Sequence, residues 1–138
     1  MHHQYSKKEK NYVKNFKACS LDLNNFHHKQ HLLITYVLLI DNNIEDTYKE
    51  IKNGVLTILN SVGVDLTKYH ETMSYGWILI VQHFMHKTPP CSNFDEFITQ
   101  NGQLLDVNIL HQYYSKTLIQ TEKARTNILN PDIKDVAY

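Results

Sequence analysis

The pattern of apolar and polar positions along the chain has the period of α-helices. Between residues 44 and 62, apolar side chains recur at alternating steps of four and three residues, at Ile44, Tyr48, Ile51, Val55, Leu59 and Val62. This spacing places them on one face of a helix, with charged residues on the other faces. We find no long segment with the period of two that is typical of a half-buried β-strand. The pattern therefore predicts an all-α protein.

Two other segments are almost continuously apolar and are predicted as core helices. The first extends from a cap at Asn24 or Asn25 to about Ile40, where a polar turn follows. The second opens at residues 69–72, after a candidate cap at Thr67, and ends before a pair of prolines that cannot continue a helix. Together with the helix at residues 44–62, these segments predict a bundle of three principal helices.

Shorter helices are expected around these three, at residues 6–16, 94–99, 104–114 and 118–128. We expect residues 1–20 to form a polar, partly flexible N-terminal segment and residues 21–129 to form a single helical domain. An extended C-terminal tail is expected at residues 130–138. The predicted architecture is a compact bundle with a shell of short C-terminal helices.

The composition of the chain limits which binding partners and which cellular compartment we expect for the protein. Of the 138 residues, 42% are hydrophobic, and 14 Lys and Arg balance 14 Asp and Glu, so net charge does not favour nucleic acid or an anionic membrane. The longest apolar run is shorter than the roughly 20 residues that a transmembrane helix needs. Cys19 and Cys91 show no metal-binding or redox spacing, and Met1 to Lys10 lacks an apolar signal region. These features predict a cytoplasmic protein with free thiols.

The nine histidines are the main chemical feature. His28 and His31 are three residues apart on one predicted helix, and His70 opens a second inward-facing helix. If the two helices pack side by side, three imidazoles can bind one divalent ion and leave one position open, as in catalytic zinc sites. Imidazole also suits iron and nickel. The sequence therefore predicts a transition-metal site at His28, His31 and His70, with Glu71 as candidate base for hydrolysis of a small molecule.

The same residues support a second interpretation. Buried histidines often hydrogen-bond to backbone carbonyls, and a metal-free pocket can use them to contact a ligand. On this reading the chain is a non-enzymatic ligand-binding module, or one that self-associates as a homodimer. The sequence leaves both interpretations open, and it does not identify the small molecule.

Several short motifs occur in a recognisable order: Phe26-x-His28-x-x-His31-Leu32, Tyr69-His70-x-Thr72, Phe94-x-x-Phe97, Tyr113-Tyr114-Ser115 and Asn130-Pro131-Asp132. Together they resemble an uncharacterised family of small bacterial all-helical proteins. The resemblance implies an all-α fold and marks His28, His31, His70 and Thr72 as polar site positions, which adds Thr72 to the candidate catalytic residues. The chain departs from the family pattern mildly, at Thr35 and Ser74. The resemblance brings no reaction with it.

Overall fold

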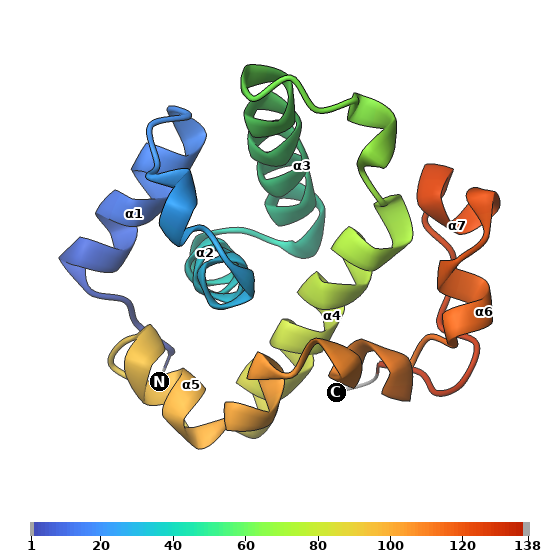
Figure 1. Cartoon of the computed structure of the whole chain (residues 1–138). Coiled ribbons are helices and arrows are strands. Elements are labelled where there is room, and N and C mark those ends of the chain that lie inside the picture. Colours follow the sequence, from blue (N-terminus) through green and yellow to red (C-terminus); the bar gives the residue numbers. More distant parts are fainter. Residues whose placement is uncertain (1, 137–138) are drawn as a thin grey trace.

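The computed structural model describes residues 2–136, and every regular element in that range is helical (Figure 1). The longer helices are α1 (Lys7–Lys17), α2 (His28–Asp41), α3 (Ile44–Ser61), α4 (Glu71–Lys87) and α5 (Phe94–Gln100). The shorter α-helices are α6 (Lys116–Ile119) and α7 (Glu122–Thr126), and four 3₁₀ helices complete the set: η1 (Leu23–Asn25), η2 (Leu66–Lys68), η3 (Gly102–Leu105) and η4 (Val107–Gln112). The predicted all-α fold class is confirmed.

Helix α2 lies at the centre of the structure, and Figure 1 shows it end-on between α1, α3 and α4. It packs against all three of these helices and against α5. Its buried side chains point in several directions and include Leu32, Ile34, Tyr36, Val37 and Leu38, each no more than 2% exposed. A helix surrounded on several sides is apolar around much of its circumference, which explains why this segment is the most apolar of the chain.

Helix α1 packs into the core, in the part of the chain where the sequence predicts a polar, partly flexible N-terminal segment at residues 1–20. Val13 and Phe16 are each only 1% exposed. The carboxylate of Glu9 accepts hydrogen bonds from the backbone N–H groups of Ser6 (2.9 Å) and Phe94 (3.0 Å). Val13 and Phe16 therefore bury one side of this mostly polar helix in the core, and Glu9 joins it to the first turn of α5.

The C-terminal part contains more breaks than the sequence predicts. Residues 104–114 form η3 and η4 in place of one helix, because the Asp106 side chain accepts from the Asn108 N–H at 2.9 Å and restarts the turn. Residues 118–128 are likewise divided between α6 and α7, with Thr121 capping α7 through the Ala124 N–H at 3.1 Å. Asp and Thr compete for backbone donors and so favour caps over helix interiors.

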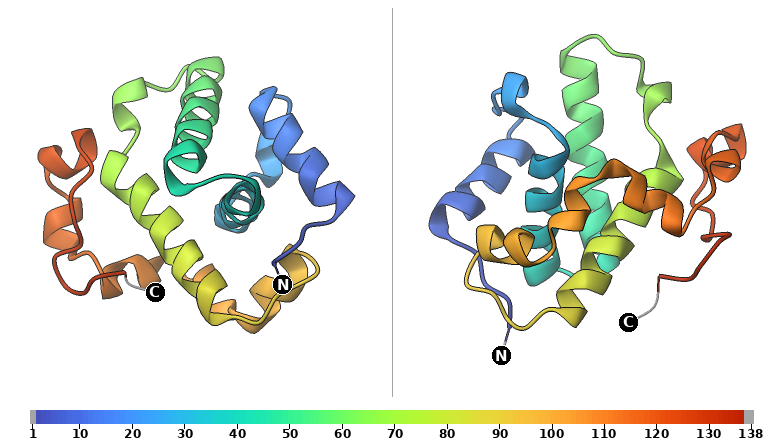
Figure 2. Two further views of the ribbon diagram at one scale, coloured as in Figure 1. Left: turned by 180° about the vertical axis from the view of Figure 1, so that it is seen from behind. Right: turned by 60° about the horizontal axis from the view of Figure 1, so that its bottom comes forward.

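Helices α6 and α7 lie on the outer side of α4, away from α1 (Figure 2). After α7 the chain has no helix through residue 136, and residues 137–138 of the expected tail lie outside the described range. This tail is held by Asp132, which accepts from the Ser115 N–H at 2.7 Å, and by Ile133, whose N–H donates to the Tyr113 carbonyl at 3.0 Å. Within residues 2–136, no helix is both long enough and apolar enough to cross a membrane.

Candidate functional site

One candidate site is a cavity of about 550 Å³ between α2, α3, the start of α4 and η4. Four histidines line it, and we call it the histidine cavity: His28, His31, His70 and His111. Much of the remaining wall is apolar and consists of Leu32, Ile51, Val55, Leu59, Met73, Trp77, Val107 and Leu110. The structure thus places His28, His31 and His70 in the wall of one cavity.

His70 holds the first turn of α4 and uses both ring nitrogens to do so. Its Nδ1 accepts a hydrogen bond from the Met73 N–H at 3.0 Å, so Nε2 carries the proton in the neutral ring. Nε2 lies 2.8 Å from the Ile119 carbonyl oxygen, to which it donates. His70 is therefore the N-cap of α4, and the predicted cap at Thr67 is wrong, since Thr67 lies in η2.

His28 links the start of α2 to the C-terminal half of the chain. Its Nε2 donates to the Leu104 carbonyl at 2.8 Å, and its ring meets Trp77 edge to face with centroids 4.6 Å apart. The helix begins at His28 because His27 is its N-cap residue, with the His27 N–H donating to Gln30 Oε1 at 3.0 Å. Asn24 and Asn25, the predicted caps, lie in η1.

His31 lies one turn further along α2, with its ring 4.4 Å from that of Phe26. The side chain is open to the solvent of the cavity, yet the surrounding protein atoms reduce its hydration. This desolvation, together with the neighbouring His28, lowers the pKa of His31 to about 4. His31 is thus a neutral imidazole at pH 7, and neither nitrogen hydrogen-bonds to another described residue in the structure.

His111 is the histidine that the sequence analysis did not assign to the site. It comes from η4, and its Nδ1 donates to the Tyr114 carbonyl at 3.0 Å. The sequence placed it on a predicted helix at residues 104–114 without indicating which side of α2 and α4 that helix would cover. Its position depends on packing between distant parts of the chain.

The arrangement gives little support to a shared metal ion. Within residues 2–136, no group of three or more His, Cys, Asp or Glu side chains is arranged to hold a metal. Both nitrogens of His70 are engaged by the backbone, and His28 retains only Nδ1. The three predicted ligands therefore do not fit one ion without the loss of these hydrogen bonds, and metal binding stays a prediction.

Glu71 and Thr72, the predicted catalytic residues, do not line the histidine cavity. The Glu71 carboxylate accepts from the Tyr48 hydroxyl and pairs with Lys52 Nζ at 2.5 Å, while burial raises its pKa. Thr72 is 0% exposed, and its hydroxyl is saturated by two backbone groups of the segment that follows α7. The contacts of Glu71 join α4 to α3, and those of Thr72 hold the segment after α7. Neither set of contacts supports a catalytic role.

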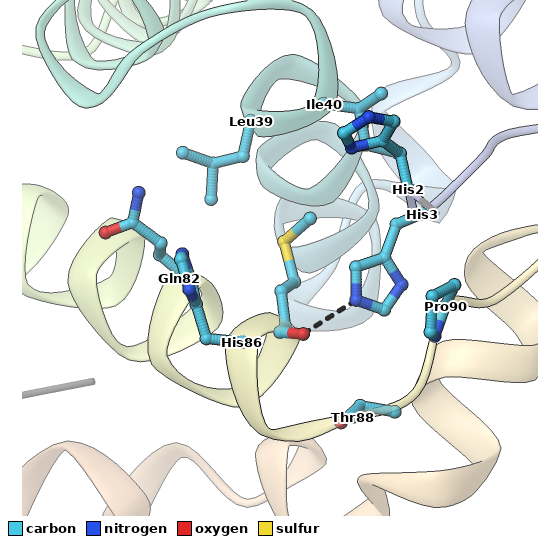
Figure 3. A pocket seen from close by; sticks show the side chains of 9 residues that line it. His2, His3, Leu39, Ile40, Gln82, His86, Thr88 and Pro90 are labelled. Atoms are coloured by element: carbon cyan, nitrogen blue, oxygen red, sulfur yellow. Dashed lines mark hydrogen bonds between the residues drawn. The ribbon is translucent and has the colours of Figure 1, made fainter.

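A second, smaller cavity of about 410 Å³ lies where α2 and α4 end, and Figure 3 shows it from close by. His3 forms part of its wall: Nε2 donates to the Met85 carbonyl at 2.7 Å, and Nδ1 accepts from the Cys91 N–H at 3.1 Å. His3 belongs to the segment at residues 1–20 that the sequence predicts to be polar and partly flexible, and here it hydrogen-bonds to residues that are distant in the sequence. We consider the histidine cavity the stronger candidate because it is larger and its polar groups come from α2, the α4 cap and η4.

Comparison of the chain with protein-family models, with curated proteins and with solved structures found no match. The resemblance to a bacterial helical family consequently stays a prediction. Any functional conclusion depends on the geometry of this chain itself.

Proposed function

We propose that this protein binds a small, largely apolar organic molecule in the histidine cavity. The observation that carries the proposal is that four histidines from three separate elements line a single, mainly apolar cavity of about 550 Å³. Pockets for small molecules commonly have volumes of about 300–1,000 Å³ and combine apolar walls with a few polar groups that orient the ligand. This is the ligand-binding alternative that the sequence left open.

The state of the histidines favours binding over catalysis. A general base works best when its pKa lies near the working pH, and His31, with a pKa of about 4, is a weak base at pH 7. The other three already use at least one ring nitrogen to hold a backbone carbonyl in place. Such fixed rings are suited to orienting a bound molecule through hydrogen bonds.

Trp77 provides a direct test, because it is the only tryptophan of the chain and it lines the cavity. We expect 1-aminoanthracene, a neutral apolar dye, to bind with one site per chain and to receive energy from Trp77. The variant Val55→Phe fills the cavity and should weaken dye binding at least tenfold. Val64→Phe, at an exposed position outside the cavity, should leave it unchanged. Absence of saturable binding, or equal binding by both variants, would contradict the proposal.

The competing proposal is the metal-dependent hydrolase predicted from the sequence, with zinc, iron or nickel at His28, His31 and His70. Elemental analysis of protein purified without an affinity tag distinguishes the two. One metal ion per chain, lost in the His31→Ala variant, would favour the hydrolase. Metal far below one ion per chain in both proteins would favour the metal-free binding pocket.

A further inference from the structure

The hydrogen bonds of the cavity histidines fix which ring nitrogens carry protons. A carbonyl oxygen can only accept, so His28 Nε2, at 2.8 Å from Leu104 O, and His111 Nδ1, at 3.0 Å from Tyr114 O, must both be donors. In a neutral ring the opposite nitrogen is then a bare acceptor. The cavity histidines therefore present two unprotonated nitrogens, His28 Nδ1 and His111 Nε2.

Both acceptor nitrogens are accessible to solvent. Neither hydrogen-bonds to another described residue, and neither belongs to the buried side-chain atoms that lack a partner in residues 2–136. An atom without a protein partner that is not buried must reach water. Because both rings line the same cavity, a bound molecule can replace that water.

The charges around the cavity restrict the ligand further. None of the described lining residues is Asp or Glu, so an organic cation would find no counter-charge there. Lys68 is the single lining cation among the described residues, and it is exposed in η2. An exposed lysine attracts an anion only weakly, because water and salt screen the charge.

We infer that the cavity selects a neutral aromatic molecule with an O–H or N–H donor, of the phenol or indole class, that donates to His28 Nδ1 or His111 Nε2. The inference rests on the proposed function and goes beyond it by naming the ligand chemistry. The aromatic ring of such a molecule suits the apolar wall, which includes Met73 and Trp77. The donor supplies one of the two imidazole acceptors with the partner that the protein does not provide.

Two substitutions of similar shape keep the structural hydrogen bonds and remove the acceptor nitrogens from their positions, because the amide oxygen that each substitution introduces is displaced from the site of the lost ring nitrogen. In His28→Gln the amide NH₂ takes the place of Nε2–H and retains the bond to the Leu104 carbonyl. In His111→Asn the amide NH₂ replaces Nδ1–H and retains the bond to the Tyr114 carbonyl. His27→Gln is the matched control, because His27 is exposed and does not line the cavity.

The test measures dissociation constants at pH 8, where an ordinary imidazole is neutral, for 2-naphthol, 2-methoxynaphthalene and 2-naphthoate. The three probes share one ring system, and only the first is a neutral donor. We expect 2-naphthol to bind about tenfold more tightly than either of the others, the effect of roughly one hydrogen bond. In the double variant His28→Gln/His111→Asn the preference over 2-methoxynaphthalene should fall below twofold. The control variant should keep it.

The outcomes separate this inference from the proposed function. If the probes bind equally, if 2-naphthoate binds most tightly, or if the double variant keeps the preference, the inference is overturned while the binding function stands. If neither the naphthalene probes nor 1-aminoanthracene bind, both are overturned. Urea unfolding of each variant shows whether it is folded. Should the double variant not fold, the two single variants decide the question: at least one must lose the preference.

Discussion

Gly54 of α3 lies directly against the aromatic ring of Phe16 in α1. A Cβ atom at position 54 would stand 2.2 Å from Cζ of Phe16, far inside van der Waals contact. The ring cannot withdraw easily, because it is 1% exposed and stacks on Phe26 with centroids 6.1 Å apart. Glycine has a low helix propensity, and Gly54 stands inside an otherwise favourable helix. The close crossing of α1 and α3 explains the glycine.

We therefore expect Gly54→Ala to destabilise the protein, although alanine is the better helix former. Alanine gains up to about 1 kcal/mol of helix propensity, whereas overpacking a close-packed core costs about 1–3 kcal/mol or more. The expected net loss is about 1–2 kcal/mol in the free energy of unfolding, measured by urea denaturation. Gly102→Ala is the control: a Cβ there meets nothing within 4 Å. If both variants were equally stable, the contact with Phe16 would not constrain the crossing.

His70 should behave as a helix cap with a second hydrogen bond. His70→Ala removes the acceptor for the Met73 N–H and the donor to the Ile119 carbonyl. Loss of a cap costs typically about 1 kcal/mol, and an unsatisfied carbonyl adds about 1 kcal/mol or more, so we expect a total loss near 2 kcal/mol. His70→Asn should recover about half, because the Asn side-chain oxygen is a good cap acceptor but does not reach Ile119. Chemical denaturation of metal-free protein gives the comparison.

The sequence predicts the parts of this fold that depend on local periodicity. The helix expected at residues 44–62 is observed as Ile44–Ser61, and Gly63, just beyond its end, has the positive φ of +75° that is common after the last turn of a helix. Caps were less predictable: His27 and His70 occupy positions where Asn, Ser, Thr or Asp are the usual residues. The division of the C-terminal segments into short turns depends on individual Asp and Thr side chains.

The candidate site is likewise predictable only as far as local sequence spacing determines it. The spacing predicts that His28 and His31 lie near each other, and the cap position of His70 places it in the wall of the same cavity. The partners of these rings lie far away in sequence: Leu104 is 76 residues from His28, and Ile119 is 49 residues from His70. No local sequence pattern indicates that these ring nitrogens would donate hydrogen bonds to distant backbone carbonyls. The sequence could therefore locate the histidines but not decide between a metal site and a hydrogen-bonded pocket.

Thr72 is expected to be a structural residue whose hydroxyl holds the segment after α7. It donates to the Asn127 carbonyl at 2.5 Å and accepts from the Leu129 N–H at 2.9 Å. Thr72→Val leaves both backbone groups without a partner and should cost about 2–3 kcal/mol. Thr72→Ser keeps the hydroxyl and should lose only about 1 kcal/mol, for one buried methyl group. Hydrogen exchange at the Leu129 amide should accelerate strongly in the valine variant alone. Equal exchange in the two variants would contradict this role.

We expect the free energy of unfolding to fall in acid, because His31 has a lower pKa in the folded protein than in the unfolded chain. Its pKa is about 4 in the folded protein and near the ordinary value of 6.5 in the unfolded chain, so between these values the unfolded chain binds more protons. The stabilisation is therefore complete above pH 6.5 and is lost progressively as the pH falls toward 4. The ring is partly open to solvent, so the loss should be smaller than the full shift implies. Urea unfolding of wild type and His31→Gln from pH 4 to 8 isolates the effect, since all other titrating groups are shared. The free energy of unfolding of the variant, relative to wild type, should rise as the pH falls through this window; a constant difference would show that His31 does not titrate there.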